Sequence, residues 1–495
     1  MPTSARPSLL DSPLLAERPR PRAVAAWPHA HWLAVGTVCL GAFLGQLTAS
    51  ITALVFPALQ EGFHASLAAV EWAALGYLLV LVALLAPVGR LSDRVGRKTV
   101  YLGGFAVFSL ASLGAGLADS LALLVACRVV QAVGGAMLQA NSVALVARGV
   151  PGAAMRTALG IQAAAQALGL ALGPTLGGLL VTHASWRWAF WINVPVGLLG
   201  ILAGWYLLPR TRPAVPPSRT VAASAPAGAT QPGSEDGRFD LPGLLLLAGA
   251  STALLLALSA ASGLPLPGWA VLALLGASAV LSVALVRQEQ RADRPIIAPG
   301  LLNTPGIRAG LLLALTGYLL LFCPLVLGPV MLAGAGVPVA TAGLVITALP
   351  GAFALAATLG GVLLPRGCTD ATRCRWGALT ATAGLLASAV LPVGPATAVP
   401  ALLAVGFGLG LLLPANNALV MRAIPAESSA VGGGMLNSVR SLGTALGTAL
   451  PVLGVHLAGR QVGGRAVLLL LAAVGLLAAA LAASAGRTAG RTAEH

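Results

Sequence analysis

Charged side chains are scarce in this 495-residue chain, in which Asp, Glu, Lys and Arg together make up 9% of the sequence. An ordinary soluble domain carries about 25% charged residues. Hydrophobic residues make up 57%, so a soluble globule of this composition would leave much of its apolar surface in water. The composition therefore excludes a cytosolic enzyme and indicates a protein whose solvent is lipid.

Acidic residues are the rarest charged type, with 14 Asp and Glu against 29 Lys and Arg, which gives a formal net charge of +15. An excess of positive charge can indicate nucleic-acid binding. Here, however, the arginines lie in short clusters between apolar stretches, as the topology signals of membrane proteins do. We therefore predict a lipid bilayer, and no nucleic acid, as a partner of this chain.

Cysteine is also rare, and the five cysteines do not form a metal-binding pattern. Cys39, Cys127 and Cys323 lie within apolar stretches, and Cys368 and Cys374 form a C-x5-C pair without an accompanying histidine. The chain has no HExxH string and no Walker A string. The sequence predicts no metal and no cofactor, and it disfavours an intramembrane enzyme.

Long hydrophobic runs are abundant. A helix needs roughly 20 apolar residues to cross a bilayer, whereas a barrel strand needs about ten residues of alternating polarity. The runs here are unbroken and favour helices. Fourteen segments are predicted: 32–59, 67–88, 99–117, 121–146, 157–182, 188–208, 241–261, 267–286, 307–331, 339–364, 376–393, 396–421, 429–455 and 466–485. The fold class is an all-α polytopic membrane protein.

The distribution of Lys and Arg predicts the orientation. If the N-terminus is cytoplasmic, 24 of the 29 basic residues fall on the cytoplasmic side of these segments. Tryptophans fall near the predicted segment ends, as interfacial rings should. We expect an even number of crossings in the cytoplasmic (inner) membrane, with both termini in the cytoplasm.

The composition of the connecting segments predicts the division into domains. Residues 209–240 are rich in Pro, Ala, Ser and Gly and cannot bury a core, so they are predicted to link two halves. The expected parts are a disordered cytoplasmic tail (1–31), an N-terminal six-helix bundle (32–208), the linker (209–240), two inserted helices (241–286), a C-terminal six-helix bundle (287–485) and a second tail (486–495).

A glycine-containing basic turn follows the second segment, where the chain reads GRLSDRVGRK. A basic loop that served only as a topology signal would need Lys and Arg in any order. This string resembles the G-x-L-x-D-R-x-G-R-K signature of the major facilitator superfamily. The resemblance implies a cytoplasmic gate formed by Gly89, Asp93, Arg94, Gly96, Arg97 and Lys98.

Two further strings narrow the resemblance. The fifth segment contains Gly169, Gly173, Pro174, Gly177 and Gly178, which is similar to the G-x3-G-P-x2-G-G motif of the drug exporters of that superfamily. The sixth begins SWRWAFWINVPVG, similar to a string of its fourteen-helix drug:proton antiporters. From the residues alone, glycines four apart indicate close helix packing. The resemblance implies a seal or pivot, and the major facilitator fold of two six-helix bundles plus two inserted helices.

Arg128 lies inside the fourth segment, where a central arginine costs about 2.5–3.5 kcal/mol on insertion scales and should face the protein interior with a partner. The family motif R-x2-Q-G-x-G is similar to the sequence here, although Ala132 replaces its first glycine. The resemblance implies a role for Arg128 in proton coupling. A purely structural, hydrogen-bonded arginine is the alternative.

Glu71 is the acidic candidate for the proton site within the segments, and an interfacial carboxylate in contact with water is its alternative interpretation. The related exporters usually carry Asp in the first helix. This chain has Gln46 near that point, and glutamine cannot titrate.

Other polar residues within the segments are candidates for a substrate cavity, although each could instead form an ordinary interhelical hydrogen bond. They are Gln46, Tyr77, Gln131, Gln139, Asn141, Gln162, Gln166, Tyr318, Asn417 and Asn437, with Asn416 and Arg440 as further possibilities. Together they describe a mostly apolar, weakly polar pocket suited to bulky amphiphilic molecules.

The function expected from these features is proton-coupled antiport, in which a monomer exports hydrophobic or amphiphilic drugs or antibiotics by alternating access. Its partners would be that small substrate, protons and the bilayer. An uptake symporter or uniporter on the same fold is the alternative, favoured by Gln46 and disfavoured by the motif in the fifth segment. A non-transporting sensor would need a folded soluble output domain, for which the sequence contains no signal.

Overall fold

The computed structural model describes residues 17, 20–151, 154–211, 240–292, 300, 304–363, 368–424 and 429–492. Within these ranges every regular element is a helix, so the predicted all-α class is confirmed. The linker predicted at 209–240 falls largely outside the described residues, as does most of the tail predicted at 1–31.

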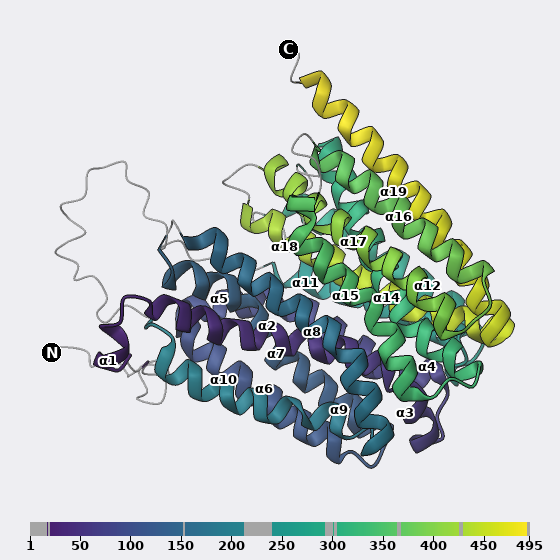
Figure 1. Ribbon diagram of the computed structural model, residues 1–495, viewed down its shortest axis with the longest axis horizontal. Coiled ribbons are helices and arrows are strands. Elements are labelled where there is room, and N and C mark those ends of the chain that lie inside the picture. Colours follow the sequence, from purple (N-terminus) through teal and green to yellow (C-terminus); the bar gives the residue numbers. More distant parts are fainter. Residues whose placement is uncertain are drawn as a thin grey trace.

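The first half of the chain forms six crossings, some of them built from two helices (Figure 1). Ser120 begins one of these helices by accepting a hydrogen bond from Leu123 N at 3.3 Å, as an N-cap serine does. The helices are α1 (Arg22–Ala25), α2 (Ala30–Leu54), α3 (Phe56–Phe63), α4 (Leu67–Val70), α5 (Trp72–Val95), α6 (Arg97–Leu117), α7 (Leu121–Gly149), α8 (Met155–His183), α9 (Trp188–Trp191) and α10 (Asn193–Leu207).

The remaining helices comprise a hairpin and a second group of six crossings, coloured teal to yellow in Figure 1. Asp240 caps the hairpin's first helix by accepting from Gly243 N at 2.9 Å. The helices are α11 (Leu241–Ala261), α12 (Trp269–Arg291), α14 (Pro305–Gly334), α15 (Val339–Leu363), α16 (Asp370–Val390), α17 (Pro395–Ala423), α18 (Ser429–Ala458), the π-helix η6 (Gly459–Gly463) and α19 (Gly464–Thr492).

The number of crossings agrees with the sequence prediction. Among the described residues, 12 stretches are long and apolar enough to cross a bilayer, and one of them, Met435–Ala483, contains both α18 and α19. These two helices reverse direction at η6 and pack against each other. The helix α16 is not among these 12 stretches, because Asp370, Arg373 and Arg375 in its first turns lower its mean hydropathy. Separating α18 from α19 and adding α16 gives fourteen.

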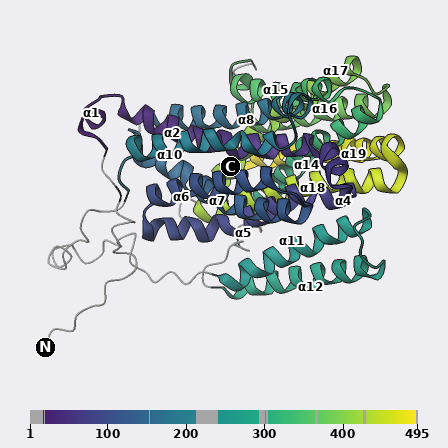
Figure 2. The ribbon, with the colours of Figure 1, turned by 90° about the horizontal axis from the view of Figure 1, so that it is seen from below.

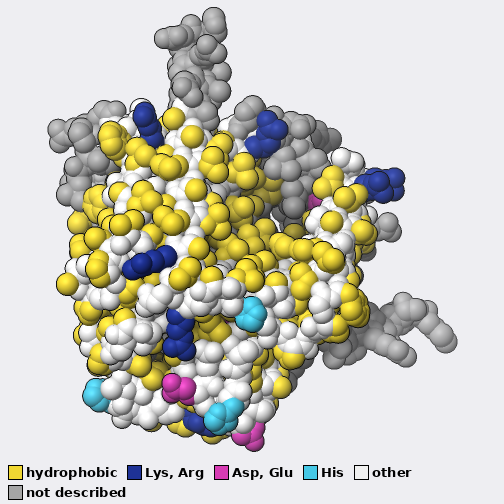
Figure 3. Space-filling view, turned by 90° about the vertical axis from the view of Figure 1, so that its right-hand side faces the viewer, with side chains coloured by type: hydrophobic (Ala, Val, Ile, Leu, Met, Phe, Trp, Pro, Cys, Tyr) yellow, Lys and Arg dark blue, Asp and Glu magenta, His cyan; other side chains and the backbone are white. Residues whose placement is uncertain are grey.

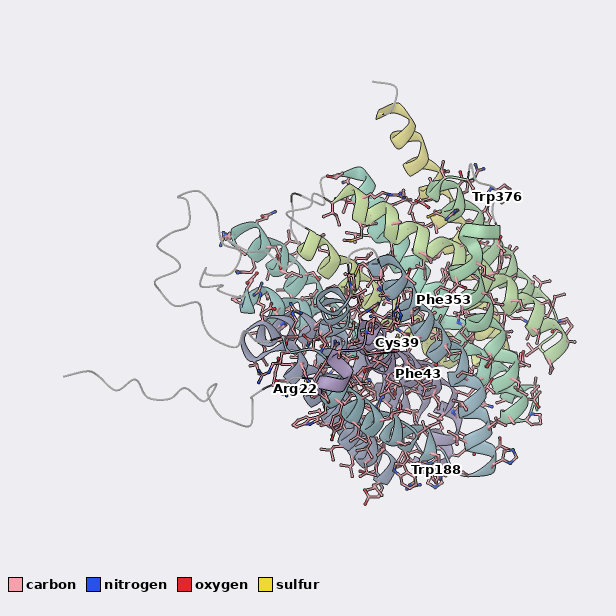
Figure 4. All side chains as sticks on the ribbon, turned by 60° about the vertical axis from the view of Figure 1, so that its left-hand side comes forward. Arg22, Cys39, Phe43, Trp188, Phe353 and Trp376 are labelled. Atoms are coloured by element: carbon pink, nitrogen blue, oxygen red, sulfur yellow. The ribbon has the colours of Figure 1, made fainter. Side chains whose placement is uncertain are left out.

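Large apolar side chains cover the outside of the bundle, as lipid contact requires. Leu272, Val390 and Leu110 are each at least 70% exposed. Figure 3 shows a face on which hydrophobic side chains predominate and charged ones are few. Trp188 and Trp376 lie near opposite margins of the molecule in Figure 4, in keeping with rings at two membrane interfaces.

We call the end of the bundle that carries the α5–α6 turn the motif end, and the opposite end, where α3, α4 and α9 lie, the far end.

The helices of each half pack mainly against one another, and a few helices join the halves. Between the halves, α8 packs against α15, and α5 packs against α18. The inserted hairpin packs on this second junction through α11, while α12 lies at the edge of the molecule (Figure 2).

Candidate functional site

A cavity lies between the two halves and is lined by residues of both. Its walls come from α2, α5, α7 and α8 of the first half and from α14 and α18 of the second. Six of the predicted cavity residues line it: Gln46, Tyr77, Gln139, Gln166, Tyr318 and Asn437. These side chains supply hydrogen-bonding groups on an otherwise mostly apolar wall.

Four of the predicted cavity residues do not line this cavity, because helix packing engages or buries them elsewhere. Gln131 binds Arg128 and Ser112, and Asn141 binds Ser92 Oγ at 2.8 Å. Gln162 is only 3% exposed on α8, and Asn417 lies on α17, which contributes nothing to the cavity wall. Of the further candidates, Asn416 donates to Gly310 O at 2.8 Å and is buried.

Arg440 of α18 is the charged residue of the cavity wall. Its guanidinium carbon lies 4.7 Å from the centre of the Tyr318 ring, which is a cation–π geometry. Among the described residues that line the cavity, none is acidic. Gln46 takes the place on α2 where the resemblance would put an aspartate, so the described wall carries positive charge and no negative charge.

Arg128 is buried in the first half and hydrogen-bonded to neutral groups. It is 1% exposed, donates from Nε to Ala73 O at 2.7 Å and also donates to Gln131 Oε1. Gln131 in turn donates to Ser112 Oγ at 2.6 Å. The guanidinium carbon lies 4.5 Å from the centre of the Tyr77 ring. Arg128 therefore faces the interior with partners, as the insertion cost requires, but it makes no ion pair with a described carboxylate.

Glu71 lies at the junction of α4 and α5, where it is the residue before α5 begins. Its side chain is 0% exposed, so the alternative of a carboxylate in contact with water is wrong. Ser259 of α11 donates to its Oε1, and Oε2 has no hydrogen-bond partner in the described chain. The inserted hairpin covers this carboxylate, which lies two residues before the carbonyl that Arg128 holds.

Ser259 is not among the residues that the sequence predicts for the site, because no local pattern points to it. It lies 188 residues from Glu71 in the chain, in a segment whose serines look like ordinary packing residues. Only the packing of α11 against α4 and α5 brings the two side chains together.

The α5–α6 turn holds the predicted gate residues. Gly96 adopts φ 113°, which favours glycine, and this conformation turns the chain sharply between the two helices. Asp93 pairs with Arg97 at 2.7 Å while its own side chain stays 53% exposed. Lys98 Nζ donates to Trp205 O and Leu208 O, both at 2.9 Å, at the C-terminal end of α10.

These turn contacts all lie within the first half. Arg97 also approaches Asn141 Oδ1 at 3.5 Å, which ties the turn to α7. Gly89 meets no atom within 4 Å of where a side chain would begin. The side chain of Arg94 falls outside the described part of the structure.

The glycine string of α8 serves two contacts on different faces. Side chains added at Gly169, Gly173 or Gly177 would collide with α2, at Phe43 O, Ser50 Oγ and Ile51 respectively. Close approach of the helix backbones therefore requires small residues there, as the spacing predicts. Phe43 and Cys39, which lie on α2 and are half-buried, are labelled near the centre of the view in Figure 4.

Pro174 and Gly178 face the other half instead. A Cβ at Gly178 would lie 3.0 Å from Val339 O, and a Cβ at Gly343 would collide with Pro174 O. Thr175 and Thr347 are hydrogen-bonded across the same junction, with 2.6 Å between their Oγ1 atoms. The α8–α15 contact between the halves is therefore a backbone-to-backbone approach toward the far end of both helices.

A family model matches this chain from residue 38 to residue 448, and that model describes the Major Facilitator Superfamily. The chain belongs to the major facilitator superfamily. The match spans both halves, the inserted hairpin and the cavity between them. The predicted family is confirmed, and the protein is a polytopic membrane transporter of this superfamily.

Curated relatives include an export protein, a riboflavin transporter and a putative multidrug resistance protein. The Tetracenomycin C resistance and export protein of Streptomyces glaucescens is 32% identical over 87% of this chain and 76% of its own length. The Riboflavin transporter RibZ of Clostridioides difficile (strain 630) is 26% identical over 84% and 87%. The Putative multidrug resistance protein MdtD of Salmonella heidelberg (strain SL476) is 30% identical over 57% and 55%.

Proposed function

We propose that this protein exports hydrophobic or amphiphilic compounds from the cytoplasm in exchange for protons. The observation that carries the proposal is the combination of a cavity between two halves with a buried carboxylate, Glu71, outside that cavity. The cavity would take the substrate and the carboxylate would take the proton. The names of two relatives, an export protein and a multidrug resistance protein, support the direction and the substrate class.

Glu71 is the proposed proton carrier because its charge in the buried site depends on very few groups. A buried carboxylate is costly when it is charged and unpaired. Here one hydroxyl, that of Ser259, binds Oε1, and no described cation pairs with the acid. Gaining a proton on Oε2 removes the charge, so protonation would change how α5 and α11 hold together.

Arg128 is proposed as a positioning residue for this site. Its Nε fixes the carbonyl of Ala73 at 2.7 Å, in the first turn of α5. It thereby sets the place of the turn that carries Glu71. Tyr77, which lies one turn further along α5, reaches both Arg128 and the cavity, so it offers a path between the proton site and the substrate site.

Alternating access would proceed by movement of one half against the other around the cavity. Two junctions join the halves: α8 meets α15 in a tight contact toward the far end, and α5 packs against α18. We propose that the motif end faces the cytoplasm, with both termini, because the basic clusters of the sequence gather on that side.

Uptake of a small solute by a symporter or uniporter is the second candidate. One observation supports transport of a compound other than a drug: RibZ, a similar protein over most of its length, is named as a riboflavin transporter. The same fold can work in either direction, so direction must be measured.

Everted membrane vesicles test both candidates. The vesicles are acidified inside, and the gradient is followed by quenching of the dye 9-amino-6-chloro-2-methoxyacridine. Tetracenomycin C, riboflavin and anthracene-9-carboxylate are added in turn, with vesicles that lack the protein as the control. Antiport predicts that at least one compound enters the lumen and collapses the gradient. Transport without proton release, or release only together with efflux of the compound from the lumen, would contradict the export proposal.

A further inference from the structure

Arg440 has no counter-charge in the cavity it lines. Its guanidinium makes no ion pair and donates no hydrogen bond to another residue in the described part of the chain. The face of the guanidinium lies over the Tyr318 ring, 4.7 Å from the ring centre. A guanidinium held by its face keeps its N–H edge available for a planar acceptor.

An unpaired arginine in a membrane protein is costly and commonly marks a ligand path. Its planar fork of donors matches a carboxylate in a bidentate geometry. The amide and hydroxyl groups of Gln46, Gln139, Gln166 and Asn437 can add hydrogen bonds, but none of them carries charge. The charge of the cavity therefore favours a negatively charged ligand over a positively charged one.

A second, apolar chamber adjoins this cavity. It has a volume of about 420 Å³ and is bounded by α5, α11, α14 and α18. Leu78 and Ser441 line both spaces, so the chamber and the cavity are neighbours across the α5–α18 junction. The chamber's size falls within the range of about 300–1,000 Å³ that is typical of small-molecule sites.

The two spaces present complementary chemistry on either side of α18. Leu442 and Val439 face the apolar chamber, while Asn437 and Arg440 face the polar cavity. Where α5 and α18 separate during transport, a molecule with an apolar body and one acidic group could place the body in the chamber and the acidic group on Arg440.

We propose that the substrate is an anionic amphiphile, with a carboxylate or an ionised phenol bound by Arg440 and Tyr318. This inference rests on the proposed transport function, because it names the substrate class of the same cavity. Arg440 binds the negatively charged group of the substrate, while Glu71, which is 0% exposed, carries the proton at a separate place.

Binding of three probes with one ring system tests this inference. Anthracene-9-carboxylate, its methyl ester and 9-(aminomethyl)anthracene are titrated into the full-length protein in phosphatidylcholine nanodiscs, and anthracene fluorescence is measured after subtraction of empty nanodiscs. A charge-assisted hydrogen bond contributes about 1.5–3 kcal/mol. The wild type is therefore expected to bind the carboxylate at least about tenfold more tightly than the ester, and the amine most weakly.

Three variants separate recognition from folding. Arg440→Gln should remove the preference for the carboxylate while leaving ester binding within about twofold, and Arg440→Lys should restore part of it. Arg287→Gln is the matched control, because Arg287 is exposed on α12 and lines neither the chamber nor the cavity. Equal binding of carboxylate and ester by the wild type, or an unchanged preference in Arg440→Gln, would overturn the inference.

This experiment uses no proton gradient, so its outcome is independent of the vesicle assay. A carboxylate preference that depends on Arg440 supports the substrate class even if no protons are exchanged. Proton exchange without such a preference supports the transport function and rejects the substrate class.

Discussion

Replacing Glu71 with glutamine is expected to reduce substrate-driven proton release at least tenfold. The amide keeps the size of the side chain and still accepts the hydrogen bond from Ser259, but it cannot gain or lose a proton in the physiological range. The measurement is recovery of acridine fluorescence in acid-loaded everted vesicles, with the same three compounds and with protein amounts matched by immunoblot. Binding of the probes in nanodiscs should stay within about twofold, since Glu71 lies outside the cavity.

Glu61→Gln is the matched control for this variant. Glu61 lies on α3 near the same end of the bundle, but its side chain is exposed, so its neutralisation should leave proton release unchanged. If Glu71→Gln released protons at the wild-type rate, the proton site would have to lie elsewhere in the chain.

A bulky residue at Gly343 should abolish transport and destabilise the protein. A Cβ there collides with Pro174 O and lies 3.1 Å from Gly178 Cα, so Gly343→Val forces α15 away from α8. Overpacking of a tight contact costs about 1–3 kcal/mol, and here the obstacle is backbone, which cannot rotate away. Transport in vesicles and the aggregation temperature in detergent are the two measurements.

Gly351→Val is the control on the same helix, because a Cβ at Gly351 meets no atom within 4 Å. It should keep both transport and the aggregation temperature near the wild-type values. A Gly343→Val protein with normal transport would refute the idea that α8 and α15 must approach closely for the cycle to run.

The sequence predicted the parts of the structure that follow from local patterns. Long apolar runs predicted the crossings, and the GRLSDRVGRK string predicted a tight turn in which Gly96 does adopt a positive φ. Glycines four apart predicted close packing of the α8 backbone, and Gly169, Gly173 and Gly177 do meet α2. The insertion cost of a central arginine predicted an interior place with partners for Arg128.

Contacts between distant segments could not be predicted in this way. The burial of Glu71 depends on α11, which comes from the inserted hairpin and reaches across the α5–α18 junction. No local pattern says which polar residue will face a cavity and which a neighbouring helix, so Gln131 and Gln139, eight residues apart on α7, have different environments. Pairings such as Thr175 with Thr347 depend on how the two halves dock.

Movement of the two halves against each other is the central claim, and a reversible cross-link tests it directly. Thr175 and Thr347 touch across the α8–α15 junction, with 2.6 Å between their Oγ1 atoms. Thr175→Cys and Thr347→Cys are introduced together into a protein whose five native cysteines are replaced by alanine. Transport is measured before oxidation, after formation of the disulfide, and after reduction. The account predicts activity that stops in the cross-linked protein and returns on reduction, with either single-cysteine variant unaffected. Full transport by a quantitatively cross-linked protein would contradict it.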